Sequence, residues 1–129
     1  MDAERIVAQF TEAWNTNDPK ERRRLIEATC SEATEIVSPY GQHRGISAQL
    51  EDIDQVRKQY PKARCTATVL AQHHGWVMDS WTTELGDGQA PLHGVDITLI
   101  DYNGRFAKVI SFSPLPEIKP TRPPQSGRL

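Results

Sequence analysis

The first part of the chain carries apolar residues at helical spacing. Apolar positions recur every three or four residues over residues 2–16, and the same spacing returns after Asp18-Pro19 and after Gly45. This period predicts three amphipathic helices. Asp18 followed by Pro19 is a favourable helix start, because aspartate caps free N–H groups and proline fits the first turn. We expect Ser47 to cap the third helix.

Further along the chain, the spacing of apolar residues changes from helical to alternating. A short strand is predicted before the third helix, and four longer strands are predicted after it. The predicted strands are residues 33–37, 65–73, 76–85, 92–102 and 105–114. Asn103-Gly104 is the strongest hairpin signal and predicts a type I′ turn. Helices followed by a strand meander predict an α+β domain, with the helices packed on one face of a sheet.

Length and composition indicate a single globular domain with a short tail. The chain has 129 residues, of which 37% are hydrophobic and 25% are charged. We expect one domain at residues 1–116 and a proline-rich tail at residues 117–129, because five of the nine prolines lie from Pro114 onward. Cys30 and Cys65 form no disulfide or zinc framework, no apolar run could span a membrane, and the charged start lacks a secretory signal. These features predict a cytoplasmic protein with no membrane partner.

Charge and histidine placement limit the classes of partner. A net charge of −2 argues against nucleic-acid binding. The basic run that contains Arg22 is interpreted as a solvated helix face, with a docking patch for an acidic partner as the alternative. Adjacent His73 and His74 point in opposite directions along a strand, and no other histidine has metal-ligand spacing. We therefore expect neither a metal site nor a cofactor.

Several segments, in this order, resemble one known superfamily. The segments AWNTND, ATEIVSPYGQHRG, HHGWVMDSW and GVDITLIDYNGRF are similar to those of nuclear transport factor 2-like proteins, and most similar to SnoaL-like (polyketide cyclase-like) single-domain members. The resemblance covers residues 4–114. It implies a cone in which a curved mixed or antiparallel sheet wraps the three N-terminal helices around an apolar pocket. It also implies a homodimer that pairs through the outer sheet face. The same cone hosts several unrelated activities, so the fold does not give the function.

The resemblance also assigns residues to catalytic positions of the family. In ketosteroid isomerase-like members an aspartate base stands where this chain has Ser38, and an oxyanion tyrosine stands where it has Phe10. Neither residue can do that chemistry unaided, so steroid isomerase activity is not expected. The second oxyanion donor of those isomerases, which matches the acid/base aspartate of the polyketide cyclases, corresponds to Asp96. Asp96 is therefore the lead catalytic candidate.

The direction in which Asp96 points has two interpretations. Val95, Ile97 and Leu99 are the more apolar set on this strand, so alternation alone would bury them and leave Asp96 in water. In the fold that the chain resembles, a second subunit covers the outer face, and Asp96 would then face the pocket. Burial there would raise its pKa and let it act as an acid or acid/base group.

Asp79 is a second candidate carboxyl, and its direction is also open. Asp79 and Trp81 are two residues apart on a strand and share a face. If Trp81 lines the pocket, Asp79 could share a proton with Asp96 on a neighbouring strand. The alternative turns Trp76 and Met78 inward and leaves Asp79 on the surface.

The remaining site predictions are histidines and aromatic residues. His93 or His43 could be an acid/base partner at the pocket mouth, and the alternative is an ordinary exposed histidine. The predicted catalytic set is Asp96, Asp79 and His93. The predicted ligand-binding set is Phe10, Trp14, Ser38, Tyr40, His43, Trp81 and Phe112. The aromatic residues of this set could equally be plain core residues.

The sequence therefore predicts a protein that binds a small apolar ligand. One reading is a cofactor-independent isomerase, cyclase or dehydratase that acts on an apolar carbonyl compound through Asp96. The second reading is a non-catalytic binder or carrier, since Ser38 and Phe10 lack the expected chemistry. The third reading is a protein-interaction module that uses the outer sheet face.

Overall fold

Helices and strands follow the predicted order along the chain. The computed structural model describes residues 2–119. The helices are α1 (Ala3–Ala13), α2 (Pro19–Thr29) and α3 (Ile46–Gln59). The strands are β1 (Cys30–Ser38), β2 (Gly41–Arg44), β3 (Arg64–His73), β4 (Trp76–Glu84), β5 (Leu92–Ile100) and β6 (Phe106–Phe112). The α+β class and the three predicted helices are confirmed. Within the described part of the chain, no helix combines the length and the apolar character needed to cross a membrane.

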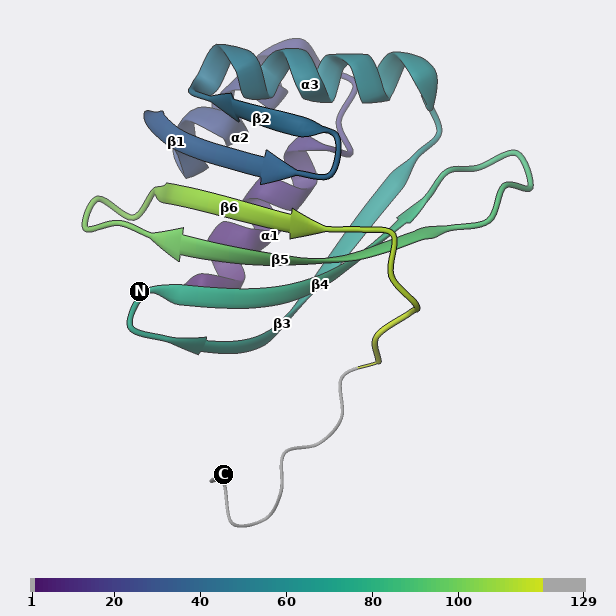
Figure 1. Cartoon of the computed structure of the whole chain (residues 1–129). Coiled ribbons are helices and arrows are strands. Elements are labelled where there is room, and N and C mark those ends of the chain that lie inside the picture. The colour runs from purple at the N-terminus through teal and green to yellow at the C-terminus, as the bar shows by residue number, and fades with distance from the viewer. Residues whose placement is uncertain (1, 120–129) are drawn as a thin grey trace.

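One curved, mixed sheet organises the molecule. Its strand order is β2-β1-β6-β5-β4-β3, and β1 and β6 are the one parallel pair among the described strands. Figure 1 shows α1 behind the sheet and α3 along its β1–β2 end. In agreement, α1 contacts β3 and α2, whereas α3 contacts β1, β2 and α2. The helices therefore lie on one side of the sheet, and the other side is left open.

The core lies between the sheet and the helices. Ile6 and Val7 form the buried face of α1, and Ile26 of α2 and Ile53 of α3 are fully buried beside the same core. Phe106 of β6 packs edge-on against an α1 side chain in this layer. This is the apolar stripe that the helical spacing predicts.

The type I′ turn predicted at Asn103-Gly104 occurs at a different hairpin. His74 and Gly75 both have positive φ, at 52° and 83°, which is the pattern of a two-residue type I′ turn, and they join β3 to β4. In the β5–β6 turn Gly104 has positive φ but Asn103 does not. The Asp101 carboxylate accepts two backbone N–H bonds within that turn, and this holds a longer loop. The hairpin is as predicted, but the type I′ assignment is wrong.

The start of α3 and the strand before it also differ from the prediction. Gly45, with φ 93°, is the N-cap residue and makes no side-chain cap bond, so Ser47 lies inside the first turn and does not cap it. A Cβ on Gly45 would lie 3.1 Å from a Glu32 carboxylate oxygen. The four-residue strand β2 is not predicted, because its sequence GQHR contains no apolar residue to mark it.

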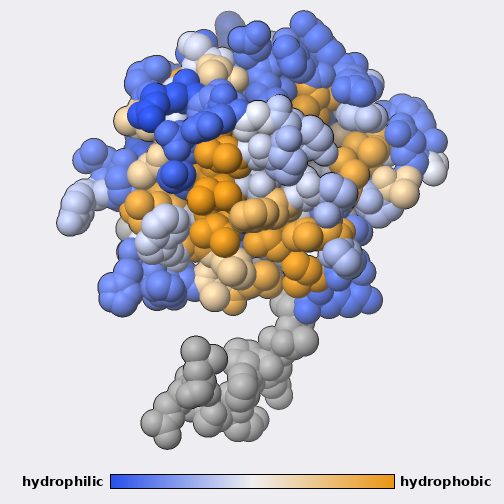
Figure 2. All heavy atoms as spheres, in the orientation of Figure 1, coloured by the Kyte–Doolittle hydropathy of each residue, from blue (hydrophilic) through white to orange (hydrophobic). Residues whose placement is uncertain are grey.

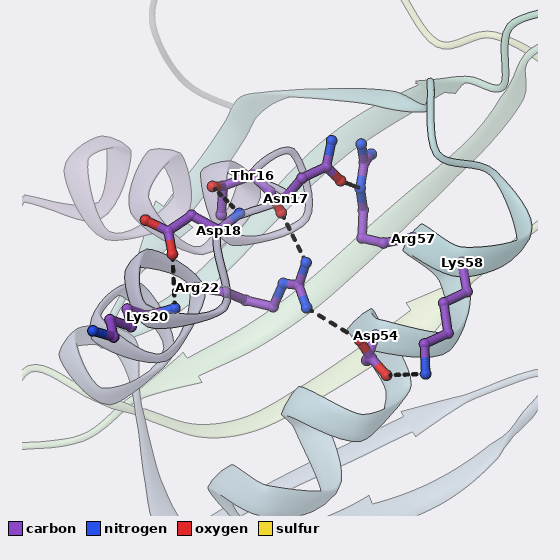
Figure 3. Close-up of polar contacts among 8 residues, drawn as sticks. All are labelled: Thr16, Asn17, Asp18, Lys20, Arg22, Asp54, Arg57 and Lys58. Atoms are coloured by element: carbon purple, nitrogen blue, oxygen red, sulfur yellow. Dashed lines mark hydrogen bonds and ion pairs between the residues drawn. The ribbon is translucent and has the colours of Figure 1, made fainter.

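The basic run on α2 is not a uniformly solvated face. Arg22 is only 6% exposed, and its guanidinium donates to the Thr16 carbonyl oxygen at 3.0 Å and reaches Asp54 at 3.5 Å. Arg57 of α3 donates to the Asn17 side-chain oxygen at 2.9 Å, and Figure 3 shows this contact together with the one between Arg22 and Asp54. Two buried guanidinium groups thus tie the α1–α2 loop to α3. The solvated-face prediction is wrong for Arg22, because this position faces α3.

The predicted tail is described only at its start. Residues 113–119 have no helix or strand. Residues 120–129 of the predicted tail lie outside the described residues.

Candidate functional site

A cavity of about 470 Å³ lies between the helices and the inner face of the sheet. Most of its wall is apolar. The apolar wall includes Val7, Phe10 and Trp14 of α1, Ile36 of β1, Val56 of α3, and Phe106 and Val109 of β6. This size and character suit a small, largely apolar molecule.

Two aspartates face each other across this cavity wall. Asp79 of β4 and Asp96 of β5 are direct partners in the antiparallel register, and both line the cavity. Val77 shares their face and is buried, whereas Trp76 and Met78 lie on the other face and are exposed. Asp79 is 4% exposed. Both carboxyl side chains therefore point into the cavity. The sequence alone left the direction of each aspartate open.

The two carboxyls differ in their hydrogen bonds. The Trp81 indole Nε1–H donates to Asp96 Oδ1 at 2.9 Å. Burial raises the pKa of Asp96, and side-chain hydrogen bonds from Ser111 and Trp81 work in the opposite direction. For Asp79, burial and the nearby Asp96 charge raise the pKa to about 8. Asp79 receives no compensating hydrogen bond from the described residues.

This asymmetry divides the roles of the pair. Two adjacent carboxyls in an apolar wall cannot both ionise easily, so they hold one proton over a wide pH range. Hydrogen-bond donors stabilise the anionic form of the carboxyl that they reach, which is Asp96. Near neutral pH the arrangement therefore favours a carboxylate on Asp96 and a carboxylic acid on Asp79.

Gly94 makes room for the Trp81 side chain. A Cβ at Gly94 would lie 2.3 Å from Trp81 Cζ2 and 2.7 Å from the Phe112 carbonyl oxygen. No ordinary side chain fits in that space, so the glycine allows the indole to lie over β5 and reach Asp96. Sequence reasoning did not find this role, because Gly94 lies within a strand rather than at a turn.

Several of the predicted ligand-binding residues line the cavity. These are Phe10, Trp14, Ser38, Tyr40 and Trp81. Tyr40 is 81% exposed, so it borders the cavity mouth rather than its interior. Phe10 packs edge-on against both Trp14 and Phe106, and it is therefore a core residue as well as a wall residue.

Three predicted residues lie elsewhere. His93 is the register partner of Thr82, whose Oγ1 lies 3.0 Å from His93 Nδ1, and both are on the outer face of the sheet. Phe112 is 51% exposed on the same outer face. His93 is three positions before Asp96, and Phe112 is one position after Ser111. Because side chains alternate between the two faces of a strand, His93 and Phe112 point outward when Asp96 and Ser111 point inward. His43 does not line the cavity but contacts Gln49, with 2.6 Å between His43 Nε2 and Gln49 Oε1.

Sequence reasoning missed two polar wall residues on α3. Gln49 and Asp52 line the cavity among apolar neighbours. Burial raises the pKa of Asp52, and the His43 charge lowers it. The available signal was a polar residue near the inward stripe formed by Ile53 and Val56.

Cys65 also lines the cavity. Burial, with a smaller contribution from the two aspartate charges, raises the pKa of its thiol to about 11. The group therefore stays a thiol at neutral pH and is a poor nucleophile. Within residues 2–119, no three His, Cys, Asp or Glu side chains are grouped as metal ligands.

Known structures with the same architecture are numerous, although no family model and no curated protein matches the chain. A proposed isomerase of the SnoaL-like family from Agrobacterium tumefaciens has a TM-score of 0.77 and 27% identity, over 84% of this chain and 94% of that one. A proposed polyketide cyclase from Sinorhizobium meliloti has a TM-score of 0.67 and 15% identity, over 83% and 93%. An NTF2-like protein of unknown function from Exiguobacterium has a TM-score of 0.67 and 16% identity, over 82% and 95%. The chain therefore has the nuclear transport factor 2-like fold, and it is similar to SnoaL-like proteins of that fold.

Proposed function

We propose that the protein is an acid–base catalyst that enolises a small apolar carbonyl compound and leads to its isomerisation or cyclisation. One observation carries this proposal. The cavity wall holds a cross-strand pair of carboxyls, of which Asp79 is buried and Asp96 is half-buried, and only Asp96 receives hydrogen bonds from Trp81 and Ser111. Such a pair supplies a base and an acid side by side. The SnoaL-like and cyclase-like neighbours support the same class of reaction.

The proposed step uses the two carboxyls in opposite roles. The Asp96 carboxylate removes a proton from the carbon next to the substrate carbonyl, and the C–H electron pair forms the C=C bond of an enol. The carbonyl oxygen takes the proton of Asp79, which becomes a carboxylate, while Asp96 becomes a carboxylic acid. Return of a proton to a different carbon gives an isomer, and attack of the enol carbon on a second carbonyl gives a ring. The sequence assigned the acid or acid/base role to Asp96, and we now assign the acid to Asp79.

The surroundings of the pair support this step. The apolar wall excludes water from the carboxyls, which strengthens a hydrogen bond from Asp79 to a developing oxyanion. Trp81 restrains the Asp96 carboxylate through its indole N–H, which fixes the orientation of this carboxylate in the cavity wall. His93 on the outer face has no part in the proposed step.

Exchange of carbon-bound hydrogen tests the proposal directly. We would follow deuterium uptake at the α-carbons of trans-2-decalone in D₂O by ¹H NMR. We expect the protein to accelerate exchange above the buffer rate and Asp96→Asn to reduce that acceleration by about 10²–10⁴-fold. His93→Gln is the control and should keep the wild-type rate. Equal rates for Asp96→Asn and wild type would contradict the assignment, whereas a bound ketone that does not exchange would favour a carrier.

The outer face of the sheet supports a partner proposal. Four apolar residues that are register partners on β1, β6, β5 and β4 form a continuous row on this face. They are Val37, Ile110, Ile97 and Met78. Figure 2 shows apolar surface gathered on the sheet side that faces away from α1. Phe112, the register partner of Val95, is exposed on this outer face. We propose that a second copy of the chain covers this face. One self-complementary patch on each copy is what a two-fold dimer requires.

A further inference from the structure

Gln49 is an unusual wall residue of the cavity. It lies within α3, is 1% exposed, and lines the same cavity as the carboxyl pair. Its Oε1 is 2.6 Å from His43 Nε2, and its Nε2 has no hydrogen-bond partner among the described residues. A buried amide donor without an acceptor is destabilising for the fold. The oxygen is fixed by His43, and the N–H groups remain a hydrogen-bond donor in this wall that no described residue satisfies.

The neighbouring charges limit what this donor can bind. Asp52 lies one helical turn after Gln49 on α3 and lines the same cavity. Its carboxyl would repel an anionic ligand group such as a carboxylate or phosphate. His43 is engaged with the Gln49 oxygen and does not itself line the cavity. A neutral oxygen acceptor is therefore the group that fits this wall.

The position of this wall sets the length of the ligand. The helix α3 contacts β1 and β2, whereas the carboxyl pair lies on β4 and β5. Strand β6 separates β1 from β5, which places β5 about 10 Å from β1 at the usual strand spacing. The cavity of about 470 Å³ connects the two regions. A ligand that meets both must extend across the sheet.

We infer that Gln49 is a specificity-determining residue that donates a hydrogen bond to a second, neutral oxygen of the substrate. The substrate class is thereby narrowed to apolar compounds long enough to span about 10 Å, with one carbonyl at the carboxyl pair and an acceptor oxygen at the far end. The inference rests on the proposed function, because it takes the first carbonyl to lie at Asp79 and Asp96.

Two rigid ketones test this inference. The probes are trans-2-decalone, with one carbonyl, and trans-decalin-2,6-dione, with a carbonyl at each end. Their dissociation constants would be measured by NMR titration. After correction for the twofold statistical advantage of the symmetric dione, we expect the wild type to bind the dione about threefold to tenfold more tightly. In Gln49→Met the corrected ratio should fall to about one.

Two further variants complete the test. Gln49→Leu removes the amide donor with a second apolar side chain and should lower the ratio as far as Gln49→Met. Gln55→Met is the matched control, because Gln55 is an exposed residue of the same helix that does not line the cavity. It should keep the wild-type ratio. A corrected ratio of one in the wild type, or a wild-type ratio in Gln49→Met, would overturn the inference.

The same samples separate this inference from the proposed function. Exchange of trans-2-decalone that depends on Asp96, with no preference for the dione, would leave the proposed function standing and reject the Gln49 subsite. A preference that depends on Gln49, without exchange of either ketone, would support the subsite and reject the catalytic proposal. Absence of binding of both ketones would reject both.

Discussion

Replacing Asp79 with asparagine removes the proton-holding group of the carboxyl pair while keeping the shape of the side chain. In the folded protein, burial and the Asp96 charge raise the pKa of Asp79 from 3.8 to about 8. Because the folded state holds this proton more tightly than the unfolded chain, Asp79 adds stability only at low pH. That contribution is complete below pH 3.8 and is lost as the pH rises to about 8.

The pKa difference sets the size of the expected effect. Between the unfolded-state value of 3.8 and pH 7, the unfolded chain gives up its proton and the folded protein keeps it. At 1.36 kcal/mol per pH unit this disfavours folding by about 4 kcal/mol at pH 7. Asparagine does not ionise, and its amide N–H can donate to the Asp96 carboxylate across the strand pair. We therefore expect Asp79→Asn to be more stable than the wild type by about 2–4 kcal/mol at pH 7.

Urea unfolding at fixed protein concentration measures this effect. The stability gap between Asp79→Asn and the wild type should be less than about 1 kcal/mol at pH 4 and should grow steadily up to pH 8. The variant keeps the pH dependence that comes from Asp96, whose pKa burial also raises. Glu51→Gln on the exposed side of α3 is the matched control and should follow the wild type at every pH. A gap that does not widen between pH 4 and pH 8 would refute the buried, protonated state of Asp79.

Further predictions concern the surroundings of the pair and the outer face. Gly94→Ala should displace the Trp81 indole, lower stability by about 1–3 kcal/mol in thermal unfolding, and shift the pH profile of ketone exchange upward as Asp96 loses a donor; an unchanged pH profile would contradict the role of the indole. His93→Gln should leave ketone exchange within about twofold of wild type, because His93 lies on the outer face; a loss as large as that of Asp96→Asn would show that the outer face takes part in the chemistry. Ile97→Glu places a charge within the apolar row and should convert a dimer into monomers in analytical ultracentrifugation; a wild type that is monomeric at all concentrations would reject the dimer proposal.

The order of the elements was predictable, because each has a local signal. Helical spacing marks α1, α2 and α3, and alternation marks the long strands. The prediction failed where the local signal was weak, or where the same local sequence is compatible with more than one structure. The sequence of β2 has no apolar residue, and Arg22 resembles its solvated neighbours until α3 brings Asp54 towards it. Asn103-Gly104 was overridden by the Asp101 side chain, which stabilises a different turn.

The direction of the two aspartates could not be read from alternation. In a sheet with one solvated face, the apolar residues of a strand identify the inner face. Here both faces of β4 carry large apolar residues, with Val77 and Trp81 inside and Trp76 and Met78 outside. The period of two is present, but it does not say which set is buried. Only the family resemblance favoured an inward Asp96, and the structure agrees with that direction.

The distribution of polar groups in the cavity supports chemistry more strongly than the fold does. A carboxyl buried without a partner of opposite charge destabilises a protein, and a second carboxyl beside it adds repulsion. The packing of β4 and β5 does not require this pair, since Val77 fills the neighbouring inner position as an ordinary apolar residue. The same strands also hold a glycine that admits Trp81, and Trp81 stabilises the charge on one carboxyl but not on the other. Proton transfer requires two neighbouring carboxyls of which one is ionised and the other protonated. A pocket that only binds an apolar ligand does not require such a pair.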